Sequence, residues 1–177
     1  MNAEANRRLE NMIRLGRIES VNPSSPFSTV TVNLGEIVTT ELRVLNLRAG
    51  LDKTHDLPSI GEECIVFSPC GVLEMGVVVT GLNNISNPSP SDNPDVRLRL
   101  YEDGAVISYD VKNHILQAVL PKGGSAKIKA NVFIDGSLHV SEDITSDADI
   151  IAGNISLTKH KTSGVKGGSD TSGVPVP

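Results

Sequence analysis

The side chains of this sequence that can do chemistry are few, and most stand in turn-like contexts. Cleavage of a polysaccharide needs two carboxylates held across a groove lined with aromatic side chains. The sequence has no Trp and only 3% aromatic residues, and no Ser-His-Asp spacing or phosphate-binding loop stands out. We therefore expect a protein that is not an enzyme. The acidic candidates read as solvated turn residues, namely Asp103, Asp110, Asp143, Asp147 and Asp149.

The two cysteines and three of the four histidines are not expected to form a site. Cys64 and Cys70 flank an apolar run at 65–67. The Met1 region is polar rather than a secretion signal, so two reduced thiols are expected instead of a disulfide. The pair alone lacks the further ligands that zinc requires. No role is assigned to the histidines in loop or outward-facing contexts, which are His55, His114 and His139.

Composition points to an all-β protein. Val and Ile dominate the apolar residues, while Gly, Ser, Thr, Asn and Asp are abundant, a mixture typical of short strands joined by turns. The net charge of −5 gives no basic field for binding nucleic acid. No run approaches the roughly 20 apolar residues that span a bilayer.

The N-terminal half is predicted to be a helix followed by a small barrel. Leu9, Met12 and Ile13 share one face of a helix expected over residues 1–16, which ends at Gly16 and caps the barrel. Residues 17–86 contain about five short strands, near 18–21, 30–34, 41–47, 62–67 and 76–80. Because closure removes exposed sheet edges, we expect an OB-like barrel. Binding of oligonucleotides would need more stacking aromatics than Phe27 and Phe67.

The C-terminal half has a different pattern. Residues 87–95 contain three prolines and predict an extended linker. Beyond it, residues 96–157 show alternating apolar positions, as in the unbroken alternation over 126–134, and a loose internal repeat. This alternation predicts strands that bury one face only.

We expect this half to be a trimer. A chain of about 60 residues with one narrow apolar stripe cannot bury enough surface to offset the entropy of its own ordering. Three copies wound about a common axis can share a continuous core of small β-branched residues. A twofold sandwich would need larger inward side chains to bridge about 10 Å. The prediction is an intertwined trimeric β-helix with a pointed C-terminal apex.

Segments spread over nearly the whole chain resemble the baseplate assembly protein V family, the central spikes of contractile-tailed phages and R-type bacteriocins. They are residues 11–16, 48–50, 58–62, 87–90, 103–109 and 160–175. The resemblance implies a homotrimeric needle in the tail baseplate of a virion or tailocin particle, made in the cytoplasm of a bacterial host. Its partners would be baseplate hub and tail tube proteins, and its mechanical target the outer membrane. The alternative is a trimeric tail spike that binds or cleaves surface polysaccharide.

The resemblance also implies a metal site in the apex segment, residues 158–177. Members of the family carry a His-x-His pair there, so that three chains hold one iron ion with six imidazoles. His160 matches the first position, whereas Thr162 stands at the second. The expected ligand is therefore one His160 per chain on the trimer axis, with one iron per trimer; the alternative is an axial histidine without metal.

Overall fold

The computed structural model describes residues 3–161 and divides into two compact units, which meet in the sequence between Ser125 and Ala126. The chain is mostly β, and α1 (Ala3–Asn11) is the α-helix of the described part. No helix among the described residues is long and apolar enough to cross a membrane.

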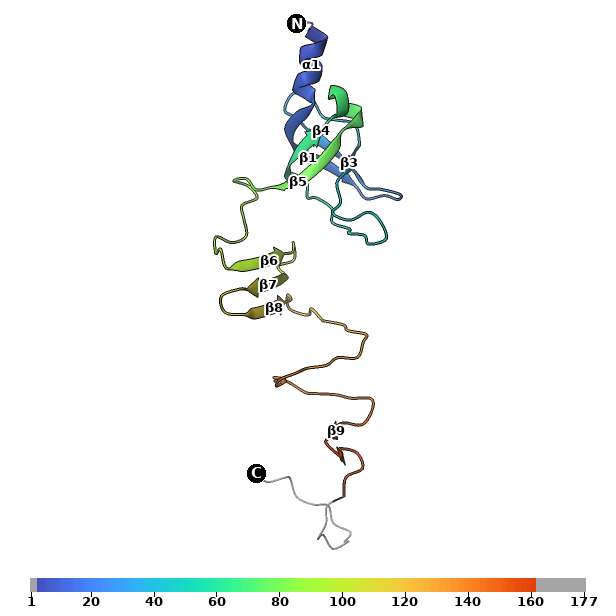
Figure 1. Ribbon diagram of the computed structural model, residues 1–177, viewed down its shortest axis with the longest axis vertical. Helices are drawn as coiled ribbons and strands as arrows, with labels where there is room; N and C mark the ends of the chain where they lie inside the picture. Colours follow the sequence, from blue (N-terminus) through green and yellow to red (C-terminus); the bar gives the residue numbers. More distant parts are fainter. Residues whose placement is uncertain (1–2, 162–177) are drawn as a thin grey trace. The chain divides into compact units, whose positions relative to one another are not determined.

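Five strands of the first unit close into a barrel (Figure 1). They are β1 (Ile13–Asn22), β2 (Thr29–Asn33), β3 (Leu42–Val44), β4 (Glu63–Phe67) and β5 (Val77–Leu82), in the spatial order β1-β2-β3-β5-β4. The β3–β5 pair is parallel, and the other pairs are antiparallel. The predicted five-stranded, OB-like barrel is confirmed.

The barrel interior is filled by medium-sized aliphatic side chains. Because side chains alternate across a strand, each strand sends every second residue inward. The largest fully buried side chains are Ile18, Leu42, Val30, Val32, Val66, Val78 and Cys64. Cys64 and Cys70 are both free thiols, the first buried and the second exposed. Burial, with a smaller effect of Glu62 and Glu63, raises the pKa of the Cys64 thiol to about 11.

The N-terminal helix is shorter than expected, because part of the predicted helix joins the barrel. α1 ends at Asn11, and β1 begins at Ile13, which pairs with Phe67 of β4. Backbone pairing with β4 outweighs the weak helical preference of residues 13–15. Gly16 is not a helix stop. It lies within β1, where an added Cβ would come within 2.5 Å of Cγ1 of Val32.

The helix is fastened to the barrel through a short 3-10 turn, η1 (Pro69–Gly71), which follows β4. A second such turn, η2 (Leu73–Met75), leads into β5. The α carbon of Gly71 lies so close to the carbonyl group of Arg8 that an added Cβ would clash with it. Gly71 also has a φ of +69°, which favours glycine.

Residues 83–95 form no helix or strand and lead to a three-stranded antiparallel sheet. Its strands are β6 (Val96–Leu100), β7 (Val106–Asp110) and β8 (Ile115–Val119). Two tight turns connect them, and they lie side by side in chain order (Figure 1). The alternation seen in the sequence over 96–100 and 105–109 thus corresponds to real strands.

The second unit consists largely of extended chain. Its described part forms one short hairpin, β9 (Ile151–Ala152) with β10 (Ile155–Ser156). The strand expected over residues 126–134 has no pairing partner among residues 3–161 and is not formed in the single chain. Figure 1 shows this segment as extended chain that reverses direction at bends. The backbone groups of 126–134 form no hydrogen bond with one another or with the rest of the described chain.

Candidate functional site

His160 lies directly after the β9–β10 hairpin, in a turn that fixes the orientation of its ring. Its backbone amide donates to the carbonyl of Ser156 at 3.0 Å. Its Nδ1 lies 2.9 Å from the carbonyl oxygen of Leu157 and 3.2 Å from that of Ser156. Because a carbonyl oxygen can only accept, Nδ1 is the donor in these contacts. Nε2 is then the ring nitrogen through which His160 could bind a metal ion.

Asp149 holds the same turn together from the opposite side. The Ser156 hydroxyl donates to Oδ2 of Asp149 at 2.5 Å, and the Thr158 amide donates to Oδ1 at 3.2 Å. The Ser156 hydroxyl, first, and the Thr158 groups hold the pKa of Asp149 below its ordinary value. The Ser156 hydroxyl oxygen also accepts from the Lys159 amide at 2.8 Å. Asp149 therefore positions the segment that carries His160.

Within residues 3–161, His160 is the candidate ligand in this turn. Among residues 3–161, no three His, Cys, Asp or Glu side chains form a group that can hold a metal ion. Thr162, at the position of the second family histidine, lies outside the described residues. The orientation of the His160 ring is compatible with a metal ligand, and the described residues offer no other ligand set to complete a coordination shell.

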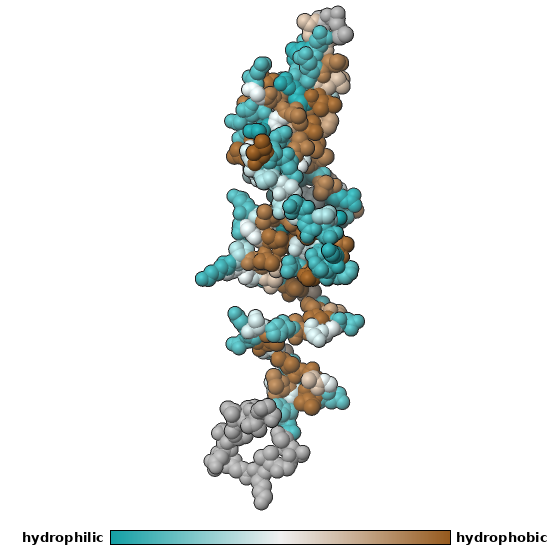
Figure 2. Space-filling model, turned by 90° about the vertical axis from the view of Figure 1, so that its left-hand side faces the viewer, coloured by the Kyte–Doolittle hydropathy of each residue, from teal (hydrophilic) through white to brown (hydrophobic). Residues whose placement is uncertain are grey.

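A second candidate site is a series of apolar residues in the second unit. Apolar residues recur here at every sixth position, in two interleaved series. The first series is Val132, Leu138, Ile144 and Ile150, and the second is Ile128, Ile134 and Val140. All of these side chains are exposed, Ile128 by 72% and Leu138 by 67%. Figure 2 shows hydrophobic side chains at the surface of this unit. The sequence prediction of a loose repeat missed this period, although it can be read from the residue numbers alone.

The sheet β6–β8 also exposes apolar side chains. Its registers place Leu100, Val106 and Val119 in one cross-strand row. Leu100 and Val119 are both 55% exposed. Exposed apolar side chains that are contiguous in this way are typical of a surface that contacts another protein.

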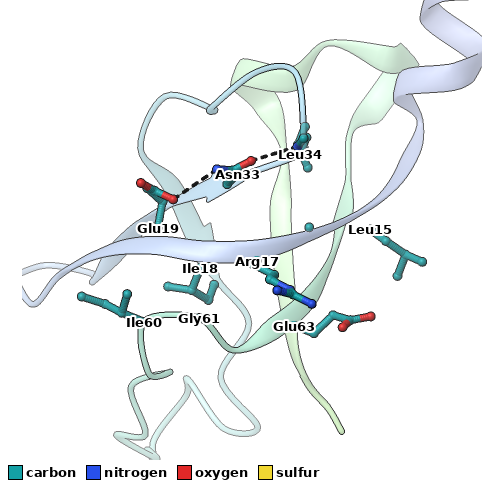
Figure 3. A pocket seen from close by; sticks show the side chains of 11 residues that line it. Leu15, Arg17, Ile18, Glu19, Asn33, Leu34, Ile60, Gly61 and Glu63 are labelled. Carbon is teal, nitrogen blue, oxygen red and sulfur yellow. Dashed lines mark hydrogen bonds between the residues drawn. The ribbon is translucent and has the colours of Figure 1, made fainter. Parts of the chain in front are cut away.

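A cleft on the barrel surface lies over β1, between the β2 end and the start of β4 (Figure 3). Nδ2 of Asn33 donates to Glu19 at 3.3 Å, and Oδ1 of Asn33 accepts from the Gly35 amide at 2.9 Å. Arg17 and Glu63 are cross-strand neighbours on β1 and β4. No aromatic side chain lines this cleft. Its lining mixes apolar side chains, such as Leu15 and Ile60, with the charged side chains of Arg17, Glu19 and Glu63.

The aspartates that the sequence offered as acid groups do not form a catalytic pair in the described chain; Asp103 and Asp110 instead accept backbone hydrogen bonds within turns. Asp103 accepts from the Ala105 amide at 3.0 Å, and Asp110 accepts from the Lys112 and Asn113 amides at 2.9 Å. Asp149 was placed in the same class, and its role beside His160 was missed.

The other histidines lie in three separate places. His55 lines a cleft that includes Asp56 and Arg99, His114 occupies a turn with a φ of +57°, and His139 is exposed.

Comparison with known proteins finds a match for the barrel of the first unit. Residues 14–82 match the model of a family described as the type VI secretion system/phage-baseplate injector OB domain. This range coincides with strands β1 to β5 of the closed barrel. The spike protein of Escherichia phage P2 is 29% identical over 169 residues, which cover 90% of this chain and 79% of that protein.

The resemblance to the baseplate V and spike family is confirmed. The match to the P2 protein extends beyond the barrel into the second unit, because it covers 90% of the chain. This similarity supports a role in the tail of a phage-like particle.

Proposed function

We propose that this chain is the central spike of a contractile-tail baseplate and acts as a homotrimer that pierces the bacterial outer membrane on contraction. The observation that carries the proposal is the six-residue apolar period in the second unit, which nothing in the described chain covers. A short, fixed period of this kind is typical of β-helical repeats, in which neighbouring segments bury each other. The relation to a protein named as a spike supports the same assignment.

Three chains suit these residues better than one or two. The periodic positions hold Val, Ile and Leu, and the residues between them are largely small or polar. Side chains of this size can fill a narrow axial core, whereas two sheets packed face to face are about 10 Å apart and need larger ones. In a threefold arrangement each unpaired segment gains strand partners on both sides, and its backbone groups become hydrogen-bonded.

The proposed work of the molecule is mechanical. A trimeric β-helix ending in a pointed apex would transmit compressive force through interchain hydrogen bonds and an axial core, without catalysis. The barrel would attach the spike to baseplate hub and tail tube proteins. The partners are then proteins and the outer membrane, with no nucleic acid or small-molecule substrate. The protein would be made in the host cytoplasm and reside in a virion or tailocin.

His160 would hold a metal ion at the apex. Three copies would supply three Nε2 atoms, one from each chain, while each Nδ1 faces the backbone carbonyls of its own turn. Iron bound there would hold the three C-terminal segments together at the apex, where the chains of a trimer separate most easily. With Thr162 in place of a second histidine, the affinity is expected to be lower than for six imidazoles.

The test is to assemble the parent particle without this chain. We expect baseplates that lack the central spike in electron micrographs, and particles that no longer infect or kill. The wild-type chain supplied in trans should restore activity. The Ile134→Asp variant should not, because it places a charge in the proposed core. Lys127→Asp is the matched control on the opposite face of the alternating segment and should restore activity.

Full activity of particles without the chain would contradict the proposal. So would equal rescue by Ile134→Asp and Lys127→Asp. Release of reducing sugar from lipopolysaccharide or capsule by the purified protein would favour the polysaccharide-cleaving tail spike instead.

A further inference from the structure

Strands β4 and β5 are apolar on both faces. Cys64, Val66 and Val78 point into the barrel core. The residues between and beside them on the outer surface are also apolar, namely Ile65, Phe67, Val77 and Val79. A strand with water on one face normally alternates apolar and polar residues, whereas a continuous apolar run is typical of a strand covered on both faces.

The strand registers extend this surface onto β1. Ile13, Phe67 and Val77 form one cross-strand row, and Leu15, Ile65 and Val79 form the next. We call these six residues the outer barrel patch. Ile13 is 63% exposed and Leu15 is 62% exposed in the single chain. Figure 2 shows hydrophobic side chains gathered over the barrel next to the helix. An apolar surface of this kind marks a protein contact site.

Charges of both signs border the outer barrel patch. Arg17 and Glu63 form the next cross-strand pair on β1 and β4. On the β3 side of the patch, Arg43 pairs with Val77. A border that carries charges of both signs can face a partner surface that also carries both signs, such as another copy of this chain. It does not suit a polyanion, which would require an excess of basic residues.

The outer barrel patch adjoins the sheet that begins the spike half. Val79 lines the same cleft as Arg99 of β6, and Arg99 forms an ion pair with Asp56 of the barrel. A copy of the chain that covers the β6–β8 sheet is therefore also close to the patch. The connection at 83–95 keeps each barrel near its own spike strand, so trimerisation of the spike would raise the local concentration of barrels.

We propose that the outer barrel patches of three copies pack together around the same threefold axis as the spike. This inference rests on the proposed homotrimer and adds a second contact, between barrels, that the spike alone does not require. Three patches that meet at an axis bury each other and close the assembly without leaving a free apolar face.

Tryptophan fluorescence tests the barrel contact in the full-length protein, since the natural sequence has no Trp. Phe67→Trp places the probe in the outer barrel patch, and Ile37→Trp places it in the β2–β3 connection. The two positions are matched in the single chain, at 43% and 42% exposed. In the trimer, we expect iodide to quench Phe67→Trp several-fold less than Ile37→Trp. Leu15→Trp is a second probe of the patch in case Phe67→Trp does not fold.

The outcomes separate this inference from the proposed function. Protection of both patch probes in the trimer supports the barrel contact. If the protein is a trimer but both patch probes are quenched as strongly as Ile37→Trp, the barrel contact is wrong and the spike trimer stands. If the protein sediments as a single chain, the homotrimer and the barrel contact both fail.

Discussion

Asp149 and His160 form the best-defined polar arrangement of the second unit. The carboxylate accepts from the Ser156 hydroxyl and the Thr158 amide, and the turn so formed directs Nδ1 of His160 at two carbonyl oxygens. Groups that orient a metal ligand without touching the metal commonly affect affinity by about 10- to 100-fold. The proposed metal site should therefore depend on a residue that is eleven positions from His160 in the sequence.

Replacing Asp149 by Asn tests this dependence. Asn has one acceptor oxygen in place of two, so one of the bonds to Ser156 or Thr158 is lost and the His160 ring is less well oriented. We expect Asp149→Asn to weaken iron binding by about tenfold or more, measured by elemental analysis after dialysis against graded chelator. Asp147→Asn is the matched control, and equal iron retention in both variants would show that Asp149 does not position the site.

The sequence pointed to a candidate ligand, His160, but not to the residue that orients it. His160 was nominated from a family resemblance, because a lone histidine carries no spacing signal. Asp149 was grouped with four other turn aspartates, since nothing in the local sequence shows which amides a carboxylate accepts from. Its partners Ser156 and Thr158 become neighbours only when the β9–β10 hairpin folds back.

Among the secondary-structure elements, the barrel strands were predictable, and the helix boundary was not. In a strand such as β2, the alternation of Val and Thr predicts the strand from the local sequence alone. Residues 13–15 fit either a helix or a strand by local pattern. Pairing with β4, some fifty residues further along the chain, decides in favour of the strand. The unpaired segment 126–134 has a strand pattern too, but its partner is not within the described chain.

Gly71 offers a test of how firmly α1 is held to the barrel. Alanine there must adopt a left-handed backbone and also clash with the Arg8 carbonyl. Gly81→Ala is the control, because Gly81 has a φ of +96° but no neighbouring atom within 4 Å of an added Cβ. Left-handed backbone alone costs about 1–2 kcal/mol. We expect Gly71→Ala to lower the free energy of unfolding by a further 1 kcal/mol or so, as overpacking does.

Urea titrations of both variants at one protein concentration measure this difference. Equal destabilisation by Gly71→Ala and Gly81→Ala would show that the contact between η1 and α1 adds no stability. A larger effect of Gly71→Ala would show that the helix is an integral part of the barrel rather than a loosely attached extension.

For the whole molecule, the main feature is the contrast between the two units. The first contains a closed barrel with a packed core. In the described part of the second, the paired backbone is a hairpin of two-residue strands, and the periodic apolar side chains are exposed. A chain with that much uncovered apolar surface is not expected to be stable by itself. In the proposed trimer this stability comes from the other two copies, so assembly is the central claim.

The most direct test is the mass of the purified full-length protein in solution, measured by sedimentation equilibrium at micromolar concentration. The predicted result is one species of three times the 18.8 kDa chain mass, with a β-rich circular dichroism spectrum. A compact, well-folded single chain of 18.8 kDa would contradict the account, because the segment 126–157 would then be ordered without the partners that its apolar residues require.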